Sequence, residues 1–154
     1  MQLAEGLHVA DRFRLIRELG RGGMGSVWLA EHVALDVACA IKFIDQTGRD
    51  SEELRVRFER EAKAAAQLRS PNVVQILDYG VWQDSPYIAM EYLEGENLDQ
   101  RLDRVWVMSP GETCFIATQV ARALTKAHAA GIVHRDLKPE NIFLSRDADE
   151  EVAK

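Results

Sequence analysis

Eight residues near the end of the chain, HRDLKPEN (134–141), hold side chains that could carry out a proton transfer next to a bound anion. Asp136 could accept a proton from a hydroxyl group, Lys138 could neutralise a negative charge, and Asn141 offers an amide oxygen to a divalent cation. A polar loop that contains a proline is the plain alternative, and a His-Arg-Asp triplet alone would prove little. All eight residues follow directly after a well-marked helix, so we interpret the segment as a catalytic loop.

A glycine-rich stretch near the N-terminus, LGRGGMGSV, could bind phosphate groups. Gly20, Gly22 and Gly25 lack a Cβ atom, so the backbone there can approach a ligand closely. One alternative is a tight hairpin turn. Another is a dinucleotide-binding loop, for which Asp45 lies at a suitable distance along the chain. That loop must open a helix, whereas these glycines open the alternating, strand-like SVWLAEH, so we disfavour it.

Lys42 is the candidate cation beneath this loop. It shares one strand face with Ala38 and Ala40, where a lone lysine is usually just solvated. Glu61 makes a paired lysine more plausible than a solvated one, because its position on a predicted helix places it on the apolar face. A carboxylate held toward a core needs a partner. We therefore predict an ion pair between Lys42 and Glu61.

The segments that must position these groups alternate between strand and helix patterns. Residues 13–44 show the period of two that is typical of strands. A helix is predicted over 51–68, where Asp50 and Glu53 form a capping pattern and apolar residues recur every third or fourth position. Two more strands are predicted over 73–82 and 87–93, joined by the turn-forming QDSP. Within the first strand region Val37, Cys39, Ile41 and Phe43 alternate with Ala38, Ala40, Lys42 and Ile44, and the predicted helix carries Leu54, Phe58, Ala62 and Ala65 on one face.

The second half of the chain has a helical character. The polar segment Glu94–Asn97, EGEN, interrupts the pattern and is the predicted hinge between a β-rich part and an α-rich part. A long helix then begins at Ser109 with Pro110 and Glu112 in a capping box, and it ends at Gly131. Its predicted buried stripe consists of Ile116, Val120, Leu124 and Ala127.

Composition excludes several functional classes. The 154 residues are 47% hydrophobic, which is ordinary for a globular domain. The formal net charge of −6 argues against a nucleic-acid partner, which would require a basic surface. No apolar run is long enough to span a bilayer. Cys39 and Cys114 lie in apolar periodic segments and are predicted to be buried free thiols, as expected in a reducing cytoplasm.

The motifs, in their order along the chain, resemble those of the protein kinase family. They are Gly20-x-Gly22-x-x-Gly25-x-Val27, then Ala40-Ile41-Lys42, then Glu61, then HRDLKPEN. Lys138 is typical of the Ser/Thr branch, and RGGMGSVW with RFEREAKAAAQL resembles bacterial Ser/Thr kinases of eukaryotic type. The resemblance implies an α+β, protein-kinase-like fold with a complete, small, β-rich N-lobe carrying one long helix, followed by the first part of a helical C-lobe. The implied division is an N-terminal extension (1–12), the N-lobe (13–93), the hinge (94–97) and the start of the C-lobe (98–154).

The resemblance also implies roles for individual residues. ATP and Mg²⁺ would be the cofactors, and a serine or threonine hydroxyl of a protein the substrate. Asp136 would accept the hydroxyl proton, Lys138 would steady the γ-phosphate, and Asn141 would hold Mg²⁺. Lys42, held by Glu61, would contact the α and β phosphates.

The loop over the phosphates would comprise Leu19, Gly20, Arg21, Gly22, Gly23, Met24, Gly25, Ser26 and Val27. The adenine would lie between Leu19, Val27, Ala40 and Phe143, with Met90 behind it and the backbone of Glu91 and Leu93 along its edge.

The family pattern continues with D-F-G and A-P-E, and neither occurs in this sequence. We therefore expect a kinase domain truncated before D-F-G, with the family's ATP-dependent phosphorylation as its function. The alternative is a catalytically inactive module that binds nucleotide or a partner. The helices that would cover the apolar stripe in the family are missing, so this uncovered C-lobe face predicts self-association.

Overall fold

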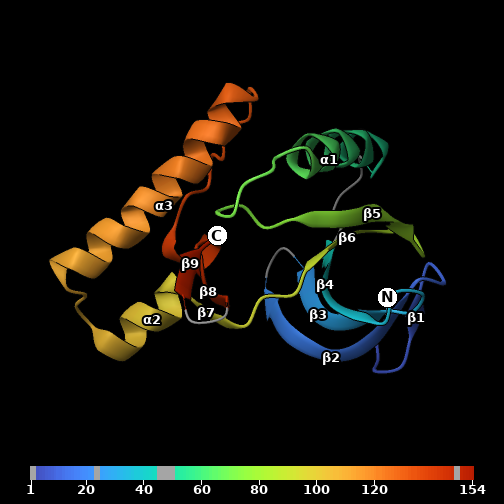
Figure 1. Cartoon of the computed structure of the whole chain (residues 1–154). Helices are drawn as coiled ribbons and strands as arrows, with labels where there is room; N and C mark the ends of the chain where they lie inside the picture. The colour runs from blue at the N-terminus through green and yellow to red at the C-terminus, as the bar shows by residue number, and fades with distance from the viewer. Residues whose placement is uncertain (1–2, 23–24, 45–50, 148–149) are drawn as a thin grey trace. The chain divides into compact units, whose positions relative to one another are not determined.

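The structure is a computed structural model that describes residues 3–22, 25–44, 51–147 and 150–154, without the side chains of 51–55, 57, 58, 61, 147 and 150. The chain divides into two compact units (Figure 1). The first comprises residues 1–67 and 75–92, and the second comprises 68–74 and 93–154. No helix in the described part of the chain combines the length and apolar character needed to cross a bilayer.

The first unit is a curved antiparallel sheet with one long helix, α1 (Ser51–Ala66). Its strand order is β1-β2-β3-β4-β6-β5. The strands are β1 (His8–Val9), β2 (Phe13–Gly22), β3 (Gly25–His32), β4 (Val37–Ile44), β5 (Ile76–Trp82) and β6 (Ser85–Glu91). Lys63 of α1 lies 5.9 Å from the ring centroid of Tyr79 on β5, a cation–π distance that ties the helix to the edge of the sheet.

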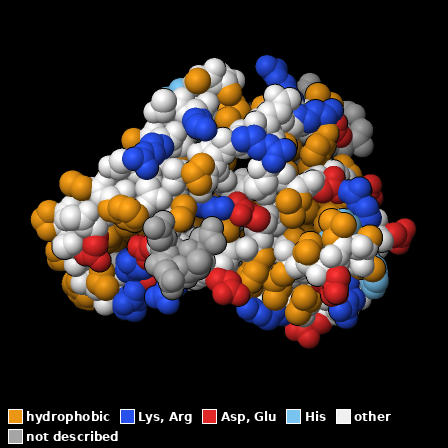
Figure 2. Space-filling view, viewed as in Figure 1, with side chains coloured by type: hydrophobic (Ala, Val, Ile, Leu, Met, Phe, Trp, Pro, Cys, Tyr) orange, Lys and Arg blue, Asp and Glu red, His pale blue; other side chains and the backbone are white. Residues whose placement is uncertain are grey.

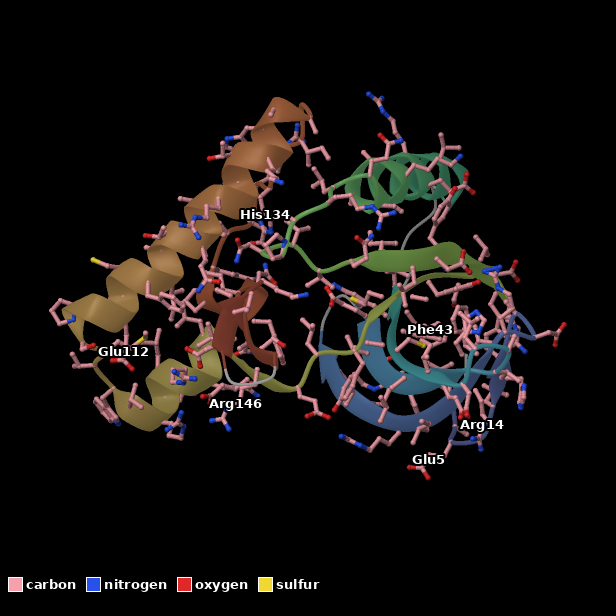
Figure 3. All side chains as sticks on the ribbon, viewed as in Figure 1. Glu5, Arg14, Phe43, Glu112, His134 and Arg146 are labelled. Carbon is pink, nitrogen blue, oxygen red and sulfur yellow. The ribbon has the colours of Figure 1, made fainter. Side chains whose placement is uncertain are left out.

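The period of two in β4 predicts the core of this unit well. Cys39, Ile41 and Phe43 are buried, and Phe43 points into the space that the curved sheet encloses (Figure 3). Val37, which has the same register, is 46% exposed, because it begins the strand at the sheet's margin. Burial raises the pKa of the Cys39 thiol to about 11, so this thiol stays protonated and inert at neutral pH. The core cluster consists of Val9, Phe13, Leu15, Trp28, Ala30, Cys39, Ile41, Phe43, Tyr87 and Ala89.

The N-terminal residues belong to the first unit. His8 and Val9 form β1 and pair with Arg14 and Phe13 of β2. Val9 is fully buried, and Leu3 and Leu7 pack against the same core. His8 and Val9 therefore add a strand to the sheet, within the part of the chain that the sequence suggested to be an N-terminal extension. The sequence missed β1 because two residues are too few to show a period.

The predicted hairpin is present as β5 and β6. Its turn is the two residues Gln83 and Asp84, whose φ angles of 46° and 64° are both positive. Turns of this type match the right-handed twist of the flanking strands. The strand β5 begins at Ile76, later than predicted, because residues 68–74 belong to the second unit.

The second unit combines a three-stranded sheet with two helices. The sheet order is β7-β8-β9, with β7 (Gly95–Asn97), β8 (Phe143–Asp147) and β9 (Glu150–Ala153). The helices are α2 (Leu98–Val105) and α3 (Pro110–Ala129), and a 3₁₀ turn, η1 (Pro139–Asn141), precedes β8. Ile116, Leu144 and Ala153 form the centre of its core.

The predicted boundaries of the long helix α3 are confirmed. The Ser109 side chain accepts a hydrogen bond from the Glu112 backbone N–H, and the Glu112 carboxylate accepts from the Ser109 N–H in return. Figure 3 shows Glu112 in this first turn. At the other end Gly131 has a φ of 75°, and the N–H of Ile132 donates to the carbonyl of Ala127. A residue at positive φ with this bond is the Schellman ending that a glycine favours.

The buried stripe of α3 is only partly confirmed. Ile116 and Ala127 are buried, while Val120 and Leu124 are half-buried and line an apolar groove of about 330 Å³ together with Leu98, Met108 and Ile142. Hydrophobic side chains are also exposed over this part of the second unit in Figure 2. The prediction that Cys114 is buried is wrong, because a residue two positions before Ile116 lies on the far side of the helix.

The segment EGEN, predicted as a hinge, follows directly after the boundary between the two units and contains a short strand, and its role as a hinge stays a prediction. Gly95, Glu96 and Asn97 form strand β7, and the Asn97 side chain caps α2 through a reciprocal bond with Gln100. The helix α2 itself was not predicted, although the spacing of Asn97 and Gln100 is the capping-box signal that could have found it.

Candidate active site

One face of the first unit's sheet collects the residues predicted to bind nucleotide. Directly paired residues of neighbouring strands share a face. Val27 of β3 pairs with Lys42 of β4, and Lys42 pairs with Ile88 of β6. Ala40, two residues before Lys42, pairs with Met90. This face is opposite to the one that Ile41 and Phe43 turn toward the core, so the half-buried Lys42 side chain is held outside the core of the unit.

The β2–β3 hairpin brings the glycine-rich stretch to the end of that face. Gly20 pairs with Val27, and Gly22 pairs with Gly25. A Cβ atom added to Gly20 or Gly22 would meet nothing within 4 Å, and neither residue has a positive φ. The fold of the hairpin therefore gives no reason for glycine at these two positions. Close approach of a ligand to the backbone is a reason that remains. Gly23 and Met24 lie outside the described residues.

Leu19 lies where the pairing of β2 with β3 is irregular. The register shifts between Glu18 and Gly20, which leaves Leu19 as the extra residue of a bulge, and its side chain is 37% exposed. Bulges change the direction of a side chain and are common beside functional sites.

At the other side of the sheet, Glu91 ends β6. Its N–H donates to the Gln75 carbonyl at 3.0 Å, and its carboxylate accepts from the Gln75 N–H at 2.8 Å. Leu93, the other backbone predicted to bind adenine, already belongs to the second unit.

In the second unit, residues 134–141 form a hydrogen-bonded loop around Asp136. The Asn141 side-chain amide donates to the Asp136 backbone carbonyl at 2.8 Å and to its carboxylate oxygen Oδ2 at 3.0 Å. The Lys138 ammonium lies 3.4 Å from the same Oδ2. The Asp136 N–H donates to Nδ1 of His134, which Figure 3 places on the segment after α3. Two of the predicted residues, Asn141 and Lys138, thus meet at the carboxylate of a third, Asp136.

The backbone of this loop is strained where the site is formed. Arg135 has a φ of 64°, a conformation that is uncommon for residues other than glycine and that clusters at functional sites. The Asp136 and Lys138 side chains are 54% and 41% exposed, so their ion pair contributes little to stability. The arrangement is better explained by a function than by stability.

A comparison with known proteins decides the family. The family model of the protein kinase domain matches residues 13–153. The chain belongs to the protein kinase family. The α+β, kinase-like fold predicted from the motifs is confirmed by solved structures: the kinase domain of PknI from Mycobacterium tuberculosis aligns with a TM-score of 0.86 and 34% identity over 99% of this chain and 61% of that chain.

Curated relatives of this kinase domain are bacterial Ser/Thr kinases. Serine/threonine-protein kinase pkn3 of Myxococcus xanthus is 43% identical over 140 residues, which are 90% of this chain and 26% of that protein. Serine/threonine-protein kinase PrkC of Bacillus subtilis is 40% identical over 139 residues, 90% of this chain and 22% of that protein. The chain thus spans about a quarter of the length of these relatives.

Phe143 and Glu61 are the remaining residues of the predicted ATP site. Phe143 begins β8 and pairs with Asn97 and, through two backbone bonds of 2.8 Å, with Lys154. Its neighbour Leu144 is buried in the core, so by strand alternation Phe143 faces away from that core. The Glu61 side chain lies outside the described residues, and its ion pair with Lys42 stays a prediction.

Sequence reasoning missed a buried polar connection within the second unit. The side-chain amide of Asn72 donates to Gln119 at 2.8 Å and to the Ala153 carbonyl at 3.0 Å, and the Ala153 N–H donates to Gln119 Oε1 at 3.0 Å. Loop 68–74, helix α3 and strand β9 are therefore joined by hydrogen bonds. A buried Gln on a mostly apolar helix face was the available signal.

It also missed an ion cluster at Arg101. This side chain, only 13% exposed, bonds to the carboxylates of Glu96 and Glu151, and Arg104 bonds to Glu96 at 2.7 Å. Hydrogen bonds from Arg104 and then Arg101 hold the pKa of Glu96 below its ordinary value. The cluster ties β7, α2 and β9 together.

The cluster predicts acid sensitivity. The pKa of Glu96 is lowered in the folded state, so its contribution to stability is complete above the unfolded-state pKa and is lost as pH falls through the folded-state pKa. Glu96→Gln should therefore destabilise the chain at pH 7, and the difference from the unaltered chain should shrink toward pH 3. Urea melts across this pH range measure it. The exposed neighbour Glu94→Gln is the control, and an equal, pH-independent effect of both variants would contradict the prediction.

Proposed function

We propose that this kinase domain serves the transfer of the γ-phosphate of ATP to serine or threonine hydroxyls of proteins. The observation that carries the proposal is the position of the Asp136 carboxylate, which is held on one oxygen by Asn141 and Lys138. The family and the names of its bacterial Ser/Thr relatives support the reaction and the acceptor class.

Asp136 would serve as the proton acceptor. Asn141 and Lys138 both contact Oδ2, so Oδ1 is the oxygen that would face the substrate hydroxyl. As the hydroxyl oxygen forms its bond to the γ-phosphorus, the bond to the ADP oxygen breaks and the hydroxyl proton passes to Asp136. The Lys138 ammonium, beside this carboxylate, would neutralise charge on the transferring group.

The described residues supply only some of the ligands that Mg²⁺ would need. The amide nitrogen of Asn141 is directed at Asp136, which turns its oxygen Oδ1 outward as a hard ligand suited to Mg²⁺. The ion would supply charge neutralisation on the phosphates. Among the described residues, however, no group of three or more His, Cys, Asp or Glu could hold a metal. The residues present thus provide part of a magnesium site.

ATP itself would bind the first unit through the sheet face that carries Val27, Ala40 and Lys42. The open space over Gly20 and Gly22 would receive the phosphates, and Lys42 would neutralise them. Because the N–H of Glu91 is bonded to Gln75, the adenine contact proposed for this residue would fall to its carbonyl oxygen.

Nucleotide binding tests the proposal directly. We expect the chain to bind ATP and ADP weakly and with little dependence on Mg²⁺, because the adenine face is present while the metal ligands are incomplete. Calorimetric titration of each nucleotide, with and without Mg²⁺, measures this. Absence of binding in all four titrations, with circular dichroism showing a folded sample, would contradict the proposal.

Two further aspects of the function are proposals. The apolar groove along α3 favours contact with a second copy of the chain, since large exposed apolar surfaces promote association. A cytoplasmic location is supported by Cys39 and Cys114, both of which are free thiols.

A further inference from the structure

Ser26, inside the glycine-rich hairpin, does not turn its side chain toward the nucleotide face. It lies next to Gly25 and is only 3% exposed. By strand alternation it shares the core face with Trp28, which is 5% exposed. The indole N–H of Trp28 donates to the Ser26 hydroxyl at 3.2 Å. The hydroxyl is therefore occupied within the core of the first unit.

This bond satisfies a polar group inside the core. A buried indole N–H requires an acceptor, because an unmet donor costs more than the net value of the bond. Trp28 pairs with Ile41 of β4, which is fully buried, so the indole itself is fixed by packing. A fixed donor bonded to Ser26 fixes the backbone of Ser26 in turn.

The position of Ser26 in the hairpin gives the bond its consequence. Ser26 pairs with Arg21, one residue pair away from the last pair that the structure describes, Gly22 with Gly25. The opposite strand is braced by an ion pair of Arg21 with Glu18 at 2.7 Å, but these side chains are 56% and 34% exposed. Exposed pairs hold geometry weakly. The buried bond is thus the stiffer of the two supports at the base of the glycine loop.

We propose that Trp28 is a positioning residue for phosphate binding, which it serves by anchoring Ser26 and with it the base of the glycine loop. The proposal rests on the proposed function, because it takes the ligand over Gly20 and Gly22 to be the phosphates of ATP. Backbone N–H groups bind phosphates best when they are already in place, since ordering a loop on binding reduces affinity. Adenosine, which has no phosphates, would bind the sheet face beside Ala40 and Met90 independently of this support.

The test compares ATP with adenosine on Trp28→Phe, which keeps an aromatic ring and removes the N–H donor. One hydrogen bond of ordinary strength corresponds to roughly a three- to tenfold change in affinity. We expect ATP to bind about that much more weakly while adenosine affinity changes less than about twofold. Titration of the whole chain with each ligand gives the ratio of the ATP affinity to the adenosine affinity. Equal losses for both ligands, or none, would overturn the inference and leave the proposed function standing. Failure of the unaltered chain to bind either ligand would overturn both.

Two controls separate positioning from general destabilisation. Ser26→Ala removes the acceptor and should change the ratio as Trp28→Phe does, and the double variant should change it no further, because both remove the same bond. Val9→Ala weakens the same core from β1, a strand that pairs with β2 and not with the strand of Trp28, and its ratio should equal that of the unaltered chain. A ratio altered equally by Val9→Ala would show that loss of core packing alone is responsible.

Discussion

Asp136→Asn is expected to lower phosphoryl transfer roughly 10²- to 10⁴-fold, which is the usual contribution of a positioned general base. The measurement needs a protein in which this chain is joined after Lys154 to the remaining part of a solved relative's kinase domain, such as that of PknI. The readout is transfer of labelled phosphate from ATP to a generic serine or threonine substrate. Asparagine can still accept the bond from Asn141 through its amide oxygen, so the loop should keep its fold while losing its proton acceptor.

The matched control for this variant is Glu140→Gln, an exposed carboxylate in the same loop. It removes the same charge four residues away and should leave the rate within about twofold, because it lies outside the contacts to Asp136. Melting curves of both variants check the fold. If the 154-residue chain alone transferred phosphate and lost that activity in Asp136→Asn, the expectation of a truncated, inactive domain would be wrong.

The proximity of the polar side chains in residues 134–141 follows from the sequence because these residues are contiguous. Asp136, Lys138 and Asn141 lie within six positions, so their contacts are set by local backbone geometry. The capping box of α3 and the turn at Gln83 and Asp84 are local in the same sense. In each case the residue type and its spacing already define the hydrogen bond.

Features that depend on distant pairing were harder to predict. The segment EGEN looks like a hinge when read alone, and it becomes strand β7 only because β8, almost fifty residues later, pairs with it. The connection of Asn72 with Gln119 spans 47 residues and leaves no local pattern. Residue type alone also does not determine exposure on α3, because the spacing from Ile116 leaves the apolar Cys114 exposed and places the polar Gln119 on the buried side.

Gly95→Ala should destabilise the second unit by about 3 kcal/mol or more. Losses of this size result from backbone strain and from overpacking. Gly95 has a φ of 150°, and a Cβ atom there would lie 2.0 Å from the carbonyl oxygen of Leu144. Leu144 is buried and its strand pairs with both β7 and β9, so the obstructing atom is backbone and cannot move aside without breaking the sheet. A shift of the melting temperature by roughly 6–12 °C would follow for a chain of this length.

Gly111→Ala provides a control of opposite sign. Gly111 lies in the first turn of α3, where an added Cβ would come no closer than 4.0 Å to the Ser109 hydroxyl. Alanine is the better helix former, so this variant should gain roughly 0.5–1 kcal/mol. Circular dichroism melts of both variants beside the unaltered chain make the comparison. Equal melting of Gly95→Ala and the unaltered chain would mean that β7 does not approach Leu144 and would contradict the prediction.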